Sequence, residues 1–173
     1  MQNIELESIV TLIEKRQFNL AIKACEVYLA KCTDCADGLN LHGLANSSVG
    51  NLNEAKLSFG KACQISPTHF RSQLNLALTL AKLYDFNAAI DSFLICQKLS
   101  PNQPNVLSSL GNLYRIIGNL NEADKLLTQA AAIAPNNPQI AENRAWLYLE
   151  QKEYDSALAL FKSLSKTFPK NLE

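Results

Sequence analysis

The sequence predicts an all-α fold, an α-α superhelix (solenoid) of stacked helix-turn-helix hairpins with a 34-residue period. The hexamer Gly-Asn-Leu-Asn-Glu-Ala occurs at residues 50–55 and again at 118–123, two periods apart. A fixed period of this length is typical of an array of helical hairpins, and no segment alternates apolar and polar residues as a strand would. Proline recurs at intervals of 34 residues at Pro67, Pro101, Pro135 and Pro169, and alanine does so at Ala21, Ala55, Ala89, Ala123 and Ala157.

The clearest copy of the repeat spans residues 104–137. Its first helix is expected to begin at Pro104, because a first helical residue needs no N–H donor. Apolar residues three or four apart then form one face of that helix. Gly118 is expected to end the helix, since glycine tolerates the left-handed C-terminal position. The residues of the apolar face are Leu107, Leu110, Gly111 and Tyr114.

The second helix of this copy should begin after Asn119, which can cap it. Glu122 follows three residues later, in an arrangement like a capping box. Ala123 lies on the stripe that faces the first helix, where a larger side chain would cost about 1–3 kcal/mol through overpacking. The next copy should start in the same way, with Asn137 capping a helix that begins at Pro138.

These residues resemble the tetratricopeptide repeat, whose hallmark is W-x2-L-G-x2-Y followed by Ala, an aromatic, Ala and Pro at fixed offsets. In the 104–137 copy, leucines replace the Trp and the second aromatic. The copy at 2–35 is degenerate and keeps little beyond Ala21. The resemblance implies a single solenoid domain over 1–173 with repeats at 2–35, 36–69, 70–103, 104–137 and 138–171. The other copies match through Gly43, Ala55, Phe59, Ala62 and Pro67; through Leu76, Ala77, Ala89, Phe93 and Pro101; and through Ala145, Tyr148, Ala157, Phe161 and Pro169.

In this family the first helix of each repeat lines a concave groove that commonly holds a peptide or an extended segment of a partner. The groove residues that the resemblance implies here are neutral, amide-rich and partly apolar. Asparagine suits such a groove because its amide both donates and accepts hydrogen bonds; alternatively, these residues are polar surface residues that keep the helices soluble. The candidate partner-binding residues are Asn40, Leu44, Arg71, Asn75, Leu78, Asn105, Ser109, Asn112, Asn143 and Trp146.

Three of these candidates favour particular kinds of ligand contact. Asn75 and Asn143 share one repeat position with Ser109 between them, which partly resembles the asparagine ladder in the arms of O-linked sugar transferases. A clamp for the acidic C-terminus of heat-shock chaperones is disfavoured, since only Asn75 matches the residues it requires. Trp146, the only tryptophan, is either an aromatic anchor for a ligand or a hydrophobic filler near a C-terminal interface.

The composition excludes several classes of protein. Hydrophobic residues make up 47% and charged residues 18%, so the chain is not disordered. Sixteen basic residues balance sixteen acidic ones, which disfavours a nucleic-acid partner because phosphate binding usually needs a basic excess. No apolar run reaches the roughly 20 residues of a membrane span, and the N-terminus lacks the pattern of a secretory signal. We therefore expect a cytoplasmic protein without membrane contact.

The sequence offers no pattern of catalytic or metal-binding residues. Cys32 and Cys35 form a lone C-x-x-C, whereas a structural zinc site needs four ligands. Neither His42 nor His69 has a recognisable partner in the sequence, and nucleotide-binding, zinc-protease and nucleophile-elbow motifs are missing. We expect no metal, no cofactor and no catalytic residue, and hence no enzyme activity in the chain itself.

The sequence therefore predicts a protein–protein interaction scaffold that binds an extended peptide or partner segment in a concave groove. The alternative is a targeting or substrate-recognition arm of a larger enzyme, such as a glycosyltransferase, sulfotransferase or methyltransferase. It is motivated by residues 171–173, which begin a further period without a polar capping helix. The same uncapped C-terminal end makes self-association a further possibility.

Overall fold

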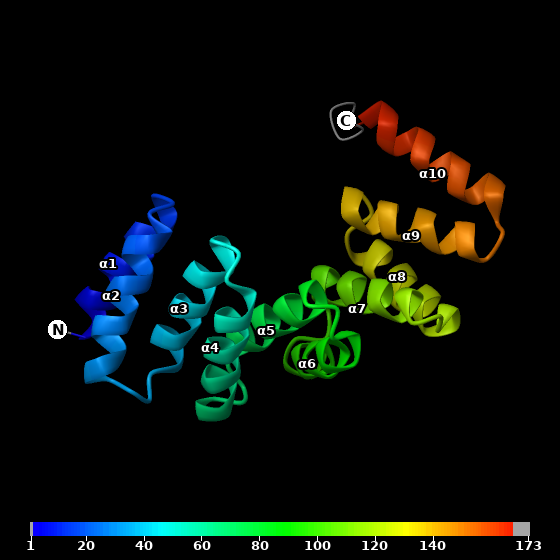
Figure 1. Cartoon of the computed structure of the whole chain (residues 1–173). Coiled ribbons are helices and arrows are strands. Elements are labelled where there is room, and N and C mark those ends of the chain that lie inside the picture. Colours follow the sequence, from blue (N-terminus) through cyan, green and yellow to red (C-terminus); the bar gives the residue numbers. More distant parts are fainter. Residues whose placement is uncertain (1, 168–173) are drawn as a thin grey trace. The chain divides into compact units, whose positions relative to one another are not determined.

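The computed structural model describes residues 2–167, and within that span it contains ten helices and no strand (Figure 1). First helices begin at residues 2, 36, 70, 104 and 138, so the period of the sequence is also the period of the structure. The predicted all-α class with helix-turn-helix hairpins is confirmed. The helices are α1 (Gln2–Glu14), α2 (Phe18–Lys31), α3 (Ala36–Ser48), α4 (Leu52–Ile65), α5 (Phe70–Lys82), α6 (Phe86–Leu99), α7 (Pro104–Ile116), α8 (Leu120–Ile133), α9 (Pro138–Glu150) and α10 (Tyr154–Thr167).

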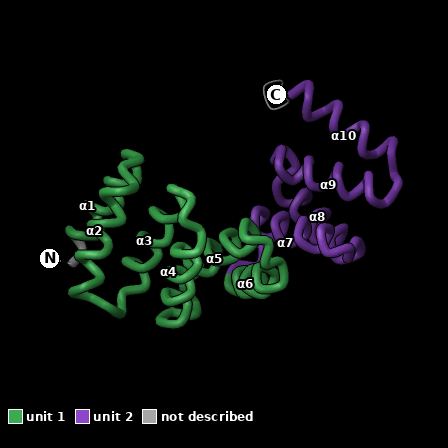
Figure 2. Tube along the Cα trace, viewed as in Figure 1, with its two compact units in different colours: residues 1–99 green, residues 100–173 purple. Residues whose placement is uncertain are grey.

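The chain divides into two compact units (Figure 2). Unit 1 covers residues 1–99 and holds α1 to α6; unit 2 covers residues 100–173 and holds α7 to α10. In unit 1 the two helices of each hairpin pack together, α2 packs on α3 and α4 on α5, and the first helices α1, α3 and α5 contact in series. In unit 2, α8 packs on α9 and α7 contacts α9. A single solenoid domain over 1–173 with five numbered repeats stays a prediction.

The periodic alanines belong to the buried core. Ala21, Ala55, Ala89, Ala123 and Ala157 are all completely buried. Small residues at other contacts follow the same logic. A Cβ placed on Gly43 would lie 2.6 Å from the Phe59 ring, and one on Gly111 would lie 2.8 Å from Leu127. The two helices of a hairpin therefore pack together through alanine and glycine residues, whose small size lets the helices approach closely.

A left-handed residue follows the first helix of every hairpin. Gly118 has φ +81°, as its predicted helix-ending role requires, and Gly50 has φ +86°. The equivalent places in the other three hairpins are occupied by Arg16, Tyr84 and Lys152, with φ between 58° and 64°. Only glycine adopts this conformation without steric cost. Three of the five turns thus keep the geometry of the hairpin despite an unsuited residue.

The predicted helix starts are confirmed in their main features. Asn119 accepts a hydrogen bond from the Glu122 N–H at 3.3 Å, and Asn137 accepts one from the Gln139 N–H at 3.0 Å. Pro104 and Pro138 are the first residues of α7 and α9. The reciprocal half of the capping box differs from expectation, because the Glu122 carboxylate pairs with Lys125.

The start of α3 is capped by a thiol. Sγ of Cys35 accepts hydrogen bonds from the Gly38 N–H at 3.3 Å and from the Tyr28 hydroxyl at 3.4 Å. Sulfur is a weak acceptor, yet here it caps the N-terminus of α3, a role for Cys35 that the sequence did not predict. One half of the C-x-x-C pair therefore has a structural role.

Candidate functional site

A pocket of about 390 Å³ opens on the first helices of unit 1. Three successive first helices, α1, α3 and α5, supply all of its lining residues. Most of the lining side chains are aliphatic, two are asparagines, one is acidic and one is basic. Four of the candidate partner-binding residues come together here. The lining residues are Val10, Ile13, Glu14, Asn40, Leu41, Leu44, Arg71, Leu74 and Asn75.

An apolar row crosses the same helices. Val10, Leu44 and Leu78 occupy one repeat position, in three consecutive periods, on α1, α3 and α5. The side chains of Val10 and Leu78 are 38% and 41% exposed, and Leu44 is half-buried. Aliphatic side chains left in contact with water along one face are typical of a surface that another molecule covers.

The sequence analysis missed the contribution of α1 to this pocket. No groove residue was assigned to the degenerate first copy, although Val10 lies one period before Leu44 at the same repeat position. Carrying that position back by one more period would have found Val10. Ile13 and Glu14 lie one turn further along α1, at positions that no other copy had suggested.

The two asparagines of the pocket are hydrogen-bonded to each other. The Asn75 amide donates to Oδ1 of Asn40 at 2.9 Å, and the Ser72 hydroxyl approaches the same oxygen at 3.4 Å. Asn40 is only 7% exposed, whereas Asn75 is half-buried. The Asn40 oxygen thus links α3 to α5, and Asn75 presents the more accessible amide of the pair.

His69 connects this pair to the junction between α4 and α5. Its Nε2 lies 3.2 Å from Oδ1 of Asp37, and its Nδ1 lies 2.6 Å from Oγ of Ser72. The order Asp–His–Ser occurs in acyl-transfer sites, but Ser72 is completely buried, so its hydroxyl meets no substrate. The contacts among Asp37, His69 and Ser72 therefore join the start of α3 to the start of α5. The expectation that His69 has no partner is wrong, because Asp37 reaches it from the start of α3, almost a full period earlier in the chain.

His42 likewise has partners that the sequence did not reveal. Its Nδ1 lies 2.8 Å from Oγ of Ser58 on α4, and its Nε2 lies 3.2 Å from the Asn46 amide. Burial lowers the pKa of His42 below its ordinary value; Glu26 and Glu54 oppose this effect and Lys61 adds to it. The ring therefore favours its neutral form inside the α3–α4 hairpin.

In unit 2 most of the candidate residues hydrogen-bond within the protein. Asn143 is buried, and its amide donates to Oγ of Ser108 at 2.9 Å. Oδ1 of Asn105 accepts from Asn137 at 3.4 Å. Oδ1 of Asn112 accepts two hydrogen bonds from Arg115, at 3.2 and 2.9 Å, and Arg115 also pairs with Glu150.

Among the described residues of unit 2, Trp146 and Ser109 are the candidates whose side chains form no hydrogen bond. Ser109 is half-buried on α7, and Trp146 is 46% exposed on α9. The indole packs edge-to-face on Phe161 of α10, with ring centroids 5.5 Å apart. One face of Trp146 is thus fixed in place while much of its surface meets solvent.

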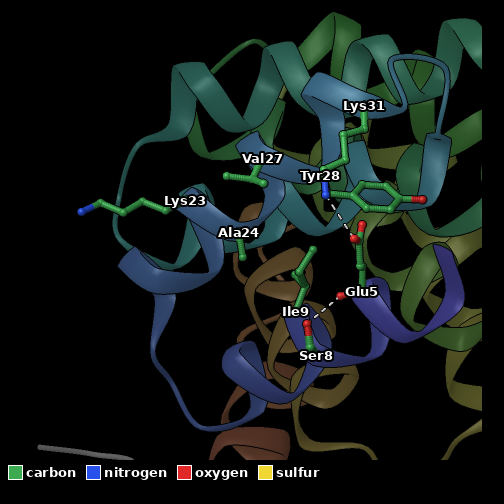
Figure 3. A pocket seen from close by; sticks show the side chains of 8 residues that line it. All are labelled: Glu5, Ser8, Ile9, Lys23, Ala24, Val27, Tyr28 and Lys31. Atoms are coloured by element: carbon green, nitrogen blue, oxygen red, sulfur yellow. Dashed lines mark hydrogen bonds and ion pairs between the residues drawn. The ribbon is translucent and has the colours of Figure 1, made fainter. Parts of the chain in front are cut away.

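A second pocket of unit 1, of about 340 Å³, lies on the first hairpin (Figure 3). Its residues come from α1 and α2 alone, and Lys31 pairs with Glu5 across it at 3.2 Å. The Lys23 side chain points away from the others (Figure 3). Because Lys31 and Glu5 neutralise each other, this pocket offers a ligand fewer available polar groups than the pocket on α1, α3 and α5.

The cysteines have the features of structural residues. Burial raises the pKa of Cys25 and Cys96 to about 12 and that of Cys63 to about 11, so these thiols stay protonated at neutral pH. Among residues 2–167, no group of three or more His, Cys, Asp or Glu side chains is placed to hold a metal ion. In the same span, no helix combines the length and the apolar content that crossing a bilayer demands.

Comparisons with known proteins identify the repeat. Two family models described as tetratricopeptide repeat match residues 117–173 and 36–69, together more than half of the chain. A comparison with curated protein sequences gave no match.

Several solved structures share the fold. MamA residues 41-end from Desulfovibrio magneticus RS-1 superposes with a TM-score of 0.88 at 13% identity, covering 99% of this chain and 97% of that one. TTC0263, a thermophilic tetratricopeptide protein of Thermus thermophilus, gives 0.74 at 20% identity, with 99% and 94% covered. YrrB, described as having an unusual peptide-binding site, gives 0.83 at 17%, with 97% and 87% covered. Helical hairpins of the same period, matching family models and shared architecture agree: the chain belongs to the tetratricopeptide repeat family.

Proposed function

We propose that this protein is an interaction scaffold that holds an extended segment of a partner protein against α1, α3 and α5. The observation that carries the proposal is the pocket of about 390 Å³ on these three helices, with an apolar row that includes its lining residues Val10 and Leu44 and continues to Leu78. Proteins of this repeat family are in general scaffolds without enzyme activity, and YrrB, which shares the fold, is described as having a peptide-binding site.

The chemistry of the pocket suits a peptide better than a polar metabolite. The aliphatic lining residues Ile13, Leu41 and Leu74 would bury an apolar side chain, at about 25 cal/mol for each Å² removed from water. The Asn75 amide could then hydrogen-bond a peptide group of the segment. Together these contacts fix an apolar anchor and the backbone next to it, the combination used by most peptide-recognition grooves.

Unit 2 is proposed to offer contacts of its own on its first helices, α7 and α9. Trp146 would contribute an aromatic contact, since its indole is half-exposed and held against Phe161. Ser109 and Asn112 would add polar contacts, and Asn105 would do so at the start of α7. Asn143 is proposed to act mainly by positioning α9, because its amide already bonds Ser108.

A partner made of protein also fits the balanced charge of sixteen basic and sixteen acidic residues, which offers no excess for phosphates. A cytoplasmic location belongs to the same proposal. The alternative, a recognition arm of a larger enzyme, would use the same pocket to select substrates. Self-association was expected from residues 171–173, which lie outside the described part of the chain.

Selection of random twelve-residue peptides displayed on phage tests the proposal on the full chain. The variant Val10→Asp places a charge on the apolar row, and Val49→Asp is its matched control, because both valines are 38% exposed and Val49 lies in the turn after α3. We expect wild type and Val49→Asp to enrich a common family of peptides that Val10→Asp does not retain. Equal enrichment by all three proteins, or no enrichment by wild type, would refute it. Circular dichroism checks that each variant is folded.

A further inference from the structure

The pocket on α1, α3 and α5 carries two charged side chains of opposite sign at its two outer helices. Glu14 is the last residue of α1, and Arg71 is the second residue of α5. Both side chains are exposed. Among the ion pairs formed within residues 2–167, none includes either of them. A cation and an anion therefore border one apolar pocket without neutralising each other or being neutralised by a neighbour.

The helices reinforce this separation of charge. The N-terminal end of a helix carries a partial positive charge and the C-terminal end a partial negative one. Arg71 thus adds its charge to the positive end of α5, and Glu14 adds its own to the negative end of α1. Each residue has the sign that its helix end disfavours, by roughly 0.3–1 kcal/mol. The side chains consequently do not stabilise their own helices, and their charge remains available to a ligand.

From this arrangement we infer that the bound segment is bipolar: one apolar residue seated in the pocket, an acidic side chain on the side of Arg71, and a basic side chain on the side of Glu14. This inference rests on the proposed function, since it names the chemistry of the segment that the same pocket binds. The guanidinium group offers a fork of donors that matches a carboxylate. The Glu14 carboxylate offers the complementary partner for an ammonium or guanidinium group. The half-buried Asn75 amide lines the same pocket, one turn after Arg71 on α5, and bonds the backbone of the segment.

Charge reversal gives a pattern that no purely structural role would produce. The same phage-displayed random twelve-residue peptides are selected on wild type, Arg71→Glu, Glu14→Lys and the double variant. Wild type should enrich peptides with one acidic and one basic residue flanking an apolar one. Arg71→Glu should enrich two basic residues around the apolar one, and Glu14→Lys two acidic residues. The double variant should again enrich one of each.

A matched control comes from the same helix. Lys82 lies in the last turn of α5, is exposed, and is not part of the pocket. Lys82→Glu makes the same kind of charge change as Arg71→Glu and should leave the wild-type pattern unaltered. A synthetic peptide of the wild-type consensus should bind Arg71→Glu with a Kd raised about two- to fivefold, the range of an exposed ion pair, and Lys82→Glu with an unchanged Kd.

The outcomes separate the inference from the function on which it rests. Peptides that need Val10 but show the same flanking charges on wild type and all three pocket charge variants would overturn the bipolar inference and leave the pocket as a binding site. Peptides retained by Val10→Asp would overturn both. Changed charge preferences with Lys82→Glu as well would trace the effect to the overall charge of the protein, and would also overturn the inference.

Discussion

The side-chain amide of Asn143 donates a hydrogen bond of 2.9 Å to Oγ of Ser108, which lies 35 residues earlier on the neighbouring first helix. Unit 1 has the same relationship, because Asn75 donates to Asn40 across an equal interval and at an equal distance. Asn143, Ser108 and Asn40 are buried. A polar pair between adjacent first helices makes a shift of one helix along the other costly, since both groups would lose their partner.

The Asn143–Ser108 pair can be measured by a double-mutant cycle. Asn143→Ala leaves a buried hydroxyl without its donor, and Ser108→Ala leaves the amide without its acceptor, so each should lower the free energy of unfolding by about 1–3 kcal/mol. The double variant should lose less than the sum of the two, with a coupling of roughly 0.5–1.5 kcal/mol. Urea unfolding followed by circular dichroism measures all four proteins. Strictly additive losses would show that the hydrogen bond adds nothing.

Gly43 should not tolerate a methyl group. Alanine there would put a Cβ 2.6 Å from the fully buried ring of Phe59, and the resulting overpacking should cost about 1–3 kcal/mol. Gly60 on α4 is the control, because nothing lies within 4 Å of a Cβ at that site. Gly60→Ala should raise the free energy of unfolding by about 0.5–1 kcal/mol, as expected for alanine replacing glycine within a helix. Thermal unfolding of the two variants should therefore shift in opposite directions; a shift in the same direction would contradict the steric argument.

The turn residues offer a stabilising substitution. Lys152 has φ 64°, which glycine adopts without strain, so Lys152→Gly should stabilise the α9–α10 hairpin. The greater freedom of glycine in the unfolded chain offsets part of the gain, leaving up to about 1 kcal/mol. Gly118→Ala should do the reverse at the equivalent turn, with a loss of about 1 kcal/mol. Denaturant midpoints test both, and a destabilised Lys152→Gly would mean that the lysine side chain stabilises the turn by more than its backbone strain costs.

Acid should destabilise the α3–α4 hairpin through His42. Burial lowers its pKa in the folded state, whereas the unfolded chain has the ordinary value of about 6.5. As the pH falls through that value the unfolded chain binds the proton first, so the free energy of unfolding should decrease between about pH 7 and pH 5.5. His42→Gln keeps a polar side chain but does not titrate there, and should flatten this part of the profile. His69 is present in both proteins, so the difference between their profiles reports His42; superimposable profiles would exclude it as the cause.

More of the fold than of the candidate site could be predicted from the sequence. Periodic Pro, Ala and Gly residues predicted the helices and turns because their steric requirements are local: Gly118 and Asn119 act within a few residues of themselves. The partners of a polar side chain are not local. An asparagine such as Asn143 has the same sequence signature whether its amide meets a ligand or a serine on the next helix. The pairing of Asp37 with His69 could not be predicted for the same reason, and Glu14 lies in the copy with the weakest repeat signature.

The left-handed turn residues distinguish two kinds of hairpin, and they alternate: Arg16, Gly50, Tyr84, Gly118 and Lys152. Glycine accordingly returns at this turn only after two periods, an interval that contains two hairpins. An interval of two periods also separates other equivalent residues. These are Gly43 and Gly111, the two asparagines Asn75 and Asn143 that each bond the preceding first helix, and the hexamers that begin at Gly50 and Gly118. These features therefore belong to pairs of successive hairpins, and a single hairpin does not repeat all of them.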